Sequence, residues 1–506
     1  MRKHTSRVAA ALGVFALSAA AVVGGSTVAY ADPAGYGNID FTKTGSLTVH
    51  KYLHQTATPG TVGDISEAPA PGDYTDPVGG VVFTVYPLLK DGAALDLTVP
   101  ATWDGLNAIA PGAACAAPAG YTLGAGVPMP ATNPAAGDAT LALPIGVYQV
   151  CETFAPSNII DRAKPFILAV PMPHENGWVY DVHAFPKNGE GEIVKSVDPQ
   201  GTDTGLGATI SYPVTAAIPA TDGPWTLFGI SDTFDSRLEP VGTGVASVAV
   251  DGAPLDPAYY SVSPVVANKV TVSFTAAGLT WLNSPLNAHA GSQIQVTFEA
   301  KVIAIGDGVI QNRAFLNTPG SDLGSDPVTV TWGSVELQKR AAGTTGTTGR
   351  LQGAVFEVYN ATAATRYAAD CTDAVADTAA GRITVGTANT FTSNATGVVA
   401  IPGLFVSDSV NPAVNADQRC YVVKEIAAPA GYVLPADPFT AITVVAGETV
   451  LADALNLDIA NNQQPPVALP LTGANGQLVL LYAGGAAAAI AIGLVLVNRR
   501  RARVTK

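Results

Sequence analysis

The sequence predicts an all-β protein made of three tandem domains. Glycine, proline, threonine, valine and alanine are abundant, and apolar residues recur at alternate positions between turn-forming segments. Long patterns with the period of a helix are scarce between the two ends of the chain. The length of 506 residues accommodates about three domains of roughly 150 residues each. We therefore expect a series of β-sandwiches.

The composition argues against a nucleic-acid partner and against an enzyme. The net charge is −14 and only 13% of the residues are charged, so no basic stripe is present to hold phosphates. The chain contains no G-x-S-x-G, no H-E-x-x-H and no P-loop motif. Its six histidines are scattered, so we expect neither a metal nor a cofactor.

Residues 1–31 have the features of a secretory signal peptide. Basic residues at positions 2, 3 and 7 precede the apolar run from Val8 to Val23. Small residues at Ala29 and Ala31 then provide a cleavage site after Ala31. A stable N-terminal anchor is the weaker interpretation, because the apolar run is short for a bilayer.

The opposite end predicts a membrane anchor. The uncharged stretch from Leu478 to Val497 is long enough to span a bilayer. Five basic residues follow it and would stay cytoplasmic: Arg499, Arg500, Arg501, Arg503 and Lys506. A buried core helix explains the run poorly, because the run is terminal and ends in these five basic residues.

A short motif precedes this span: Leu469, Pro470, Leu471, Thr472 and Gly473. An LPxTG motif, an apolar span and a basic tail, together with a signal peptide, resemble the Gram-positive surface proteins that sortase processes. The resemblance implies cleavage between Thr472 and Gly473, transient membrane anchoring by residues 478–497, and final attachment to the cell wall.

The four cysteines are expected to form two disulfides, because their number is even and the chain is exported. Proximity in the sequence favours Cys115 with Cys151 and Cys371 with Cys420, one pair in each of two domains. Zinc binding is the alternative, but no C-x2-C spacing occurs.

We place the domains at residues 32–191, 192–332 and 333–466, with the sorting signal at 467–506. A degenerate repeat relates the outer two: Val82 to Tyr86 is echoed by Val355 to Tyr359. The outer domains therefore look like versions of one sandwich, with a different sandwich between them. Pro465 and Pro466 then form a stiff spacer.

The middle domain contains a lysine that faces inward. Lys195 shares its strand face with the apolar residues Ile193 and Val197. By the same alternation Asp232 and Asn312 lie on apolar faces. Because a buried lysine is costly unless it is paired or neutral, we expect these three polar side chains to meet in the core.

The third domain repeats this pattern with Lys339, Glu425 and Asn461. The sequence from Ala427 to Tyr432, which follows Glu425, resembles the E-box of Cna-B domains. The resemblance implies immunoglobulin-like sandwiches of the Cna-B and Cna-A types, in which a lysine and an asparagine side chain are joined by an isopeptide bond. Asn462 is the alternative to Asn461, because a β-bulge would exchange the two strand faces.

Burial of the three side chains explains how this bond can form. Desolvation lowers the pKa of the lysine, so that a neutral amine attacks the asparagine carboxamide. Desolvation also raises the pKa of the acid, Asp232 or Glu425, which then hydrogen-bonds the amide oxygen and relays protons. Ammonia leaves, and neither a cofactor nor an enzyme is needed. A buried ion pair beside a bystander asparagine is the other interpretation.

The first domain offers a third set of the same residue types. Lys51 shares a face with Leu47 and Val49, Glu152 lies on an apolar face, and Asn188 falls on an inward parity. These residues permit a bond between Lys51 and Asn188 but do not decide whether it forms.

Lys187 differs from these lysines, because its parity places it on the outward face beside Pro186. The segment from Trp178 to Lys187 resembles the pilin motif W-x3-V-x-V-Y-P-K, with Ala184 and Phe185 replacing valine and tyrosine. The resemblance implies that Lys187 attacks a sortase thioester at Thr472 of another copy. A solvated surface lysine is the alternative.

Taken together, these features resemble a sortase-assembled major pilin, the shaft subunit of a fimbria that supports adhesion and biofilm formation. The implied partners are other copies of the chain, a pilin-type and a housekeeping sortase, and peptidoglycan. A minor tip pilin and a host glycan or salivary-protein receptor are further candidates. The alternatives are a singly displayed wall-anchored adhesin and a tip or basal pilin.

Overall fold

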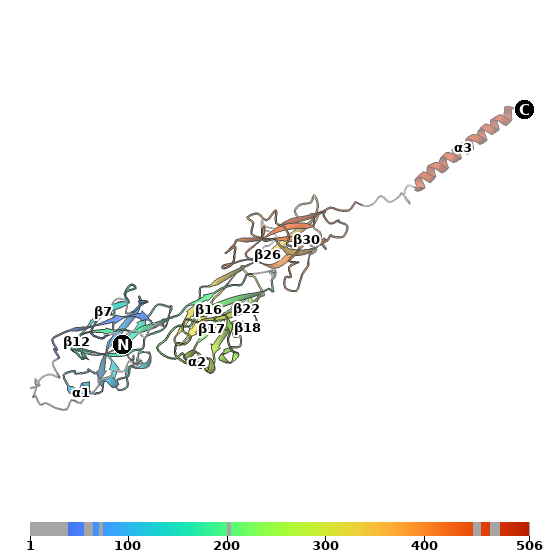
Figure 1. Cartoon of the computed structure of the whole chain (residues 1–506). Coiled ribbons are helices and arrows are strands. Elements are labelled where there is room, and N and C mark those ends of the chain that lie inside the picture. Colours follow the sequence, from blue (N-terminus) through green and yellow to red (C-terminus); the bar gives the residue numbers. More distant parts are fainter. Residues whose placement is uncertain are drawn as a thin grey trace, which may run out of the picture.

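The computed structural model describes residues 39–54, 64–69, 74–199, 204–448, 457–465 and 476–504. Three β-sandwich domains follow one another in an elongated row, and a single long helix stands beyond the third domain (Figure 1). The predicted all-β class is therefore confirmed. The signal peptide and the motif Leu469 to Gly473 lie outside the described residues.

The first domain packs two main sheets around one apolar core. In the first sheet β1 (Gly45–His50) lies between β13 (Asp181–Ala184), which is parallel to it, and β7 (Asp138–Leu143), which is antiparallel. The second sheet has the order β10 (Phe166–Val170), β8 (Gly146–Phe154), β3 (Val82–Lys90) and β4 (Ala93–Ala94), with β5 (Thr122–Leu123) and β6 (Val127–Pro128) also paired to β3. Leu47, Val49 and Phe83 are buried between the sheets, as strand alternation predicts.

A small third sheet of the first domain lies toward the middle domain. It has the order β2 (Tyr52–Leu53), β14 (Lys187–Glu190) and β9 (Ile159–Asp161). Because β2 and β14 run parallel, Lys187 is directly opposite Tyr52 and Asn188 is opposite Leu53. The remaining short elements are β11 (Met172–His174), β12 (Gly177–Val179), α1 (Pro100–Trp103), η1 (Leu106–Ala108) and η2 (Ala113–Cys115).

The middle domain consists of two five-stranded sheets. One has the order β15 (Ile193–Lys195), β16 (Thr209–Ala217), β22 (Gln293–Val302), β18 (Leu238–Val250) and β19 (Ala253–Pro254). The other has the order β20 (Tyr260–Val262), β21 (Lys269–Phe274), β17 (Gly229–Thr233), β24 (Ala314–Thr318) and β25 (Ser321–Gly324). The short helix η3 (Pro257–Tyr259) comes before β20, and helix α2 (Ala276–Asn283) follows β21. Thr275 caps α2, because its hydroxyl accepts a hydrogen bond from the amide of Gly278 at 3.2 Å.

The third domain also has two sheets. In one, β26 (Val328–Ala341) pairs with β23 (Val309–Asn312), β29 (Val398–Asp408) and β32 (Asp458–Asn461). The other has the order β28 (Phe391–Thr392), β27 (Val355–Asn360), β30 (Gln418–Ala427) and β31 (Phe439–Val445). Strand β32 closes the domain by pairing in parallel with the end of β26.

The middle and third domains share strand β26. Its first residues, Val328 to Thr331, pair with β23 of the middle domain, and Val335 to Gln338 pair with β29 of the third. The boundary expected between residues 332 and 333 therefore falls inside a continuous strand. Trp332 at this point is fully buried and packs edge-on against Phe405, with ring centroids 5.7 Å apart. A shared strand leaves no free linker at this junction.

The first and middle domains meet through side chains and a close backbone approach. His54 lies between two carboxylates, with Nε2 3.3 Å from Oδ2 of Asp161 and Nδ1 3.2 Å from Oδ1 of Asp222, which belongs to the middle domain. A Cβ atom at Gly189 would lie 2.9 Å from the carbonyl oxygen of Ala220. A glycine is therefore needed where β14 touches the middle domain.

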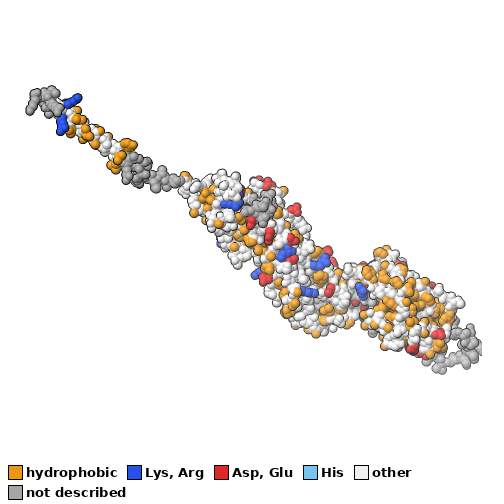
Figure 2. Space-filling model, turned by 180° about the vertical axis from the view of Figure 1, so that it is seen from behind, with side chains coloured by type: hydrophobic (Ala, Val, Ile, Leu, Met, Phe, Trp, Pro, Cys, Tyr) orange, Lys and Arg blue, Asp and Glu red, His pale blue; other side chains and the backbone are white. Residues whose placement is uncertain are grey.

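The C-terminal helix α3 (Gly476–Val504) contains the predicted span. Its segment Val479–Arg501 is long and apolar enough to cross a membrane. Figure 2 shows apolar side chains along the helix and basic ones at its far end. This charge placement matches the predicted orientation, with the basic tail on the cytoplasmic side.

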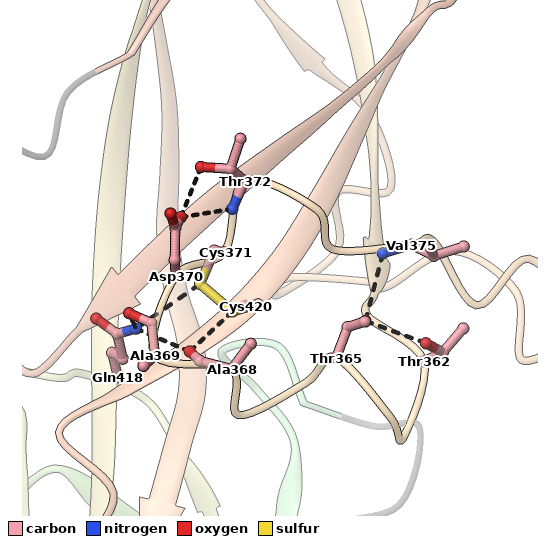
Figure 3. The surroundings of a disulfide bond; sticks show 10 residues. All are labelled: Thr362, Thr365, Ala368, Ala369, Asp370, Cys371, Thr372, Val375, Gln418 and Cys420. Atoms are coloured by element: carbon pink, nitrogen blue, oxygen red, sulfur yellow. Dashed lines mark hydrogen bonds between the residues drawn. A yellow bond between two sulfur atoms is a disulfide. The ribbon is translucent and has the colours of Figure 1, made fainter.

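Both predicted cysteine pairs are disulfides: Cys115 with Cys151, and Cys371 with Cys420. The second ties the loop after β27 to strand β30, and Gln418 supports the same loop by donating to the carbonyls of Ala368 and Ala369 at 3.0 and 2.9 Å (Figure 3). These cysteines are therefore not zinc ligands.

Candidate functional site

The third domain brings Lys339, Glu425 and Asn461 together in its core, and all three are buried. The Lys339 amine on β26 donates to Oδ1 of Asn461 on β32 and lies 3.1 Å from Oε2 of Glu425 on β30. The Asn461 amide donates to Oε1 of Glu425 at 2.8 Å and to the carbonyl of Val433 at 3.0 Å. The nucleophile, the carboxamide and the acid are thus in mutual contact.

The surroundings shift the Lys339 amine toward its neutral form. Burial lowers the pKa of Lys339, and the charge of Glu425 opposes the shift only in part. The parallel register of β26 and β32 turns Asn461 inward and leaves Asn462 exposed. The geometry therefore supports Asn461 as the residue that faces the amine.

The middle domain repeats the arrangement with Lys195 on β15, Asp232 on β17 and Asn312 on β23. The Lys195 amine donates to Oδ2 of Asp232, and the Asn312 amide approaches the same oxygen at 3.4 Å. Burial lowers the pKa of Lys195 and raises the pKa of Asp232, so both groups are shifted toward their neutral forms. The chemistry expected from the sequence needs a neutral lysine amine and a protonated acid, and both shifts are in that direction.

The first domain contains the third cluster. The Lys51 amine lies 3.0 Å from Oε2 of Glu152, and the Asn188 amide donates to Oε1 of Glu152 at 3.2 Å. The side chains of Lys51 and Glu152 are both 0% exposed. Burial is the main cause that lowers the pKa of Lys51 to about 8. All three domains therefore hold a lysine, an acid and an asparagine in one buried group.

The sequence places Lys187 on the outward face of its strand, but the Lys187 amine is not open to solvent, as an outward face alone would suggest. Its side chain leaves β14 on the face opposite to buried Asn188, as parity predicts, but aromatic side chains cover its amine. The nitrogen lies 3.4 Å from the ring centroid of Tyr74 and 4.7 Å from that of Tyr52. Strand parity assigned the face of the sheet, whereas the neighbouring side chains decided the exposure.

Tyr52 and Tyr74 are residues that the sequence analysis did not identify. Tyr52 is opposite Lys187 only because β2 and β14 pair in parallel, and Tyr74 comes from the connection that leads to β3. Neither position carries a motif. A prediction of the parallel pairing between β2 and β14 would have been needed to find Tyr52.

The fold and these clusters define a class of protein: a row of β-sandwiches with buried lysine, acid and asparagine groups, followed by an apolar terminal helix. Comparisons with known proteins agree with this class. Residues 42–189 match the family model of the Gram-positive pilin subunit D1, N-terminal domain. Residues 333–456 match a prealbumin-like fold domain, and residues 461–503 match the LPXTG cell wall anchor motif.

Relatives extend the similarity over the whole chain. Fimbrial subunit type 2 of Actinomyces naeslundii is 35% identical, with 99% of this chain and 98% of the relative covered. Fimbrial subunit type 1 of Actinomyces viscosus is 30% identical, with 98% and 99% covered. The full-length major pilin SpaD of Corynebacterium diphtheriae has a similar structure, with a TM-score of 0.65, 26% identity, and 85% of this chain and 99% of that chain covered.

The chain belongs to the family of Gram-positive fimbrial subunits. It is a shaft subunit of a pilus, and copies of the chain polymerise with one another to form that pilus. The chain is a substrate of sortase rather than an enzyme. Its anchor places it on the cell wall at the bacterial surface.

Proposed function

We propose that copies of this chain are joined by an amide between the carbonyl carbon of Thr472 in one copy and Nζ of Lys187 in the next. A sortase cysteine holds Thr472 as a thioester after Gly473 has left. The Lys187 nitrogen attacks that carbon, the new C–N bond forms, the C–S bond breaks with its electron pair on sulfur, and one proton leaves the nitrogen.

The observation that carries this proposal is the position of Lys187. It lies in the first domain, whereas the apolar helix that follows the sorting motif stands beyond the third domain, at the opposite end of the row (Figure 1). Each copy thus offers one acyl donor, Thr472, and one acceptor amine, Lys187, on different surfaces. Contacts between two different surfaces generate an open filament rather than a closed ring. Lys187 also has no carboxylate or carboxamide partner of its own among the described residues, so it is not used up inside the domain.

The same chemistry is proposed inside each domain. The amines of Lys195, Lys339 and Lys51 attack the carboxamides of Asn312, Asn461 and Asn188, with Asp232, Glu425 and Glu152 as the acids. In each case the N–C bond to the lysine forms and ammonia leaves. In each domain the acid contacts both the lysine and the asparagine, and in the third domain the Lys339 amine also contacts Asn461 directly. These contacts and the lowered pKa values of the three lysines support the proposal.

The linkage is tested by replacing Lys187 with alanine in cells and boiling surface material in SDS. We expect the ladder of high-mass polymers to disappear and monomers to remain, whereas Lys164→Ala, a change at a lysine of the same domain, leaves the ladder intact. Ladders that persist without Lys187 would contradict the linkage. Ladders absent from the unaltered protein would favour a singly displayed adhesin.

Adhesion is a further part of the proposal. As the repeated unit of a surface filament, the subunit would present any receptor site for a host glycan or a salivary protein in many copies. A tip pilin is the other proposed partner. Comparing the binding of purified filaments and of monomers to immobilised salivary proteins tests the receptor, and mass spectrometry of the filament ends tests the tip subunit.

A further inference from the structure

The surroundings of Lys187 are unlike those of an ordinary surface lysine. Its nitrogen is buried, and no hydrogen-bond acceptor reaches it from the described part of the chain. The rings of Tyr52 and Tyr74 both lie against it, and these two rings are stacked on each other with centroids 5.0 Å apart. Among the described residues, aromatic rings therefore take the place of water around this amine.

The aromatic wall extends beyond the two tyrosines. Tyr74 stacks on Phe185 with centroids 5.7 Å apart, and Phe185 stacks on His50 with centroids 5.1 Å apart. Nε2 of His50 lies 2.8 Å from Nδ1 of His183. Tyr74 is therefore packed in a row of rings, which fixes the face that it presents to the amine.

We propose that Tyr52 and Tyr74 are positioning residues for Lys187, whose ring faces hold the amine in a desolvated cradle from which it attacks the sortase thioester as a neutral nucleophile. This inference rests on the proposed function of Lys187 as the linking residue. It names the groups that prepare that residue for the reaction.

Two physical effects act on the amine in this cradle. Aromatic faces attract the ammonium form, which orients the side chain against the two rings. Loss of water disfavours the same charged form, and this largest effect lowers the pKa of Lys187 to about 8; the charge of Lys51 adds to the shift only while Lys51 is a free amine. The negative charge of Asp222 in the middle domain raises the pKa of Lys187 and so opposes this shift. His50 and His183 are further titratable groups beyond Phe185; burial lowers the pKa of His50 to about 4 and also lowers the pKa of His183, so that His50 adds little positive charge near neutrality.

The consequence for the reaction is a large gain in reactive amine. Only the neutral form of a lysine is a nucleophile, and each unit by which its pKa exceeds the solution pH lowers the neutral fraction about tenfold. An ordinary lysine at pH 7.5 is neutral in roughly one molecule in a thousand, whereas a pKa of about 8 makes the neutral form roughly a quarter of the population. The cradle thus makes one lysine of the surface chemically distinct from the others.

The first test needs no sortase. Competitive acetylation with acetic anhydride across pH 6 to 11, read by peptide mass spectrometry, reports the titration of Lys187 against exposed Lys301 as the internal reference. We expect Lys187 to titrate at a lower pH than Lys301 in the unaltered protein. We expect Tyr74→Leu, which keeps apolar volume but removes the ring, to shift the curve less than Tyr74→Ala, and Tyr74→Phe to leave it unchanged. A Lys187 curve that coincides with that of Lys301 in the unaltered protein would overturn the inference.

The second test measures the reaction. A purified pilin-type sortase and a donor peptide that contains LPLTG are used to label Lys187 at pH 7.5. We expect the rate to fall about tenfold in Tyr74→Ala and Tyr52→Ala, and Tyr74→Phe to restore it. Equal or faster labelling in both alanine variants would show that the rings merely cover the amine.

The two tests separate the inference from the proposed function. Labelling of the unaltered protein at another lysine would refute the role of Lys187, whatever the acetylation curve shows. Labelling at Lys187 with no effect of the tyrosines would refute only the cradle. Intact mass and thermal melting of each variant report whether the first domain remains folded, and Tyr74→Leu and Tyr74→Phe keep the test informative if an alanine variant unfolds.

Discussion

Two lysines of the same chain, Lys339 and Lys187, have different neighbours around their buried amines and therefore different functions: Lys339 is fully buried, and Lys187 is half-buried. Lys339 lies against a carboxamide and a carboxylate, both buried in the same core. Lys187 lies against aromatic faces, without a hydrogen-bond acceptor among the described residues. Both amines are desolvated, so burial alone does not distinguish them. The difference is an electrophile within reach: Lys339 has Asn461, whereas Lys187 must receive its electrophile from another molecule.

The largest effect is expected when the acid of the third domain is removed. Glu425→Ala should prevent the bond between Lys339 and Asn461, because no group remains to relay the protons. The bond would close a loop of 122 residues, and its loss should cost about 4 to 5 kcal/mol of unfolding free energy. Intact mass checks the bond, since its absence leaves about 17 Da of ammonia on the chain.

The control for this variant is Asp458→Asn. Asp458 lies on the same strand as Asn461, but its side chain is 57% exposed and pairs with Arg340 on the surface. Its replacement should change the mass only by the substitution itself and the stability by less than about 1 kcal/mol. If Glu425→Ala keeps the mass of the linked form, the acid is not needed, and the comparison between the two lysines loses its chemical basis.

A slightly smaller effect is expected for the disulfide of the third domain. Replacing Cys371 and Cys420 by serine opens a loop with a sequence separation of 49. The loop model gives about 4 kcal/mol, as an upper bound if the isopeptide bond already restricts the unfolded chain. Denaturant unfolding of this variant, with and without Glu425→Ala, measures how far the two cross-links overlap. Strictly additive losses would show that they restrict the unfolded chain independently.

The first domain offers a pH test of whether its bond forms. In Asn188→Ala, Lys51 stays a free amine whose pKa is lowered from 10.5 in the unfolded chain to about 8 in the folded domain. A lysine with a lowered folded pKa contributes stability that is present above pH 10.5 and is lost as the pH falls to about 8. The variant should therefore lose roughly 3 kcal/mol between these two pH values.

The unaltered protein should lack this dependence, because an amide nitrogen does not titrate. Thermal melting of both proteins from pH 7 to 10.5 provides the measurement. If the unaltered protein shows the same pH dependence as Asn188→Ala, Lys51 is uncoupled, and the first domain differs from the other two.

The smallest effect is expected at the contact between the first and middle domains. Asp222→Asn removes one carboxylate from His54, but the Asp222 side chain is 55% exposed, so the loss should stay below about 1 kcal/mol. The same change removes a negative charge that raises the pKa of Lys187. Acetylation of Lys187 should therefore shift to slightly lower pH, while unfolding changes little.

Much of the architecture follows from local patterns. Alternation along the strands around Lys195, Lys339 and Lys51 correctly placed each lysine on a buried face, since period-2 geometry is a property of the strand itself. The cysteine pairing also followed from proximity in the sequence. The boundary between the middle and third domains was harder to predict, because the sequence of β26 looks like two separate apolar segments. Only the pairing of β26 with β23 and β29 shows that it is one strand that belongs to two domains.

The sequence by itself determined the all-β class, the terminal anchor and the faces on which the polar core residues lie, because each depends on composition or on neighbouring positions. The tertiary structure brought each expected lysine, acid and asparagine together in one core, and it decided that tyrosines cover the amine of Lys187. Those contacts join residues that are distant in the chain, and strand pairing, which local periodicity does not encode, brings them together.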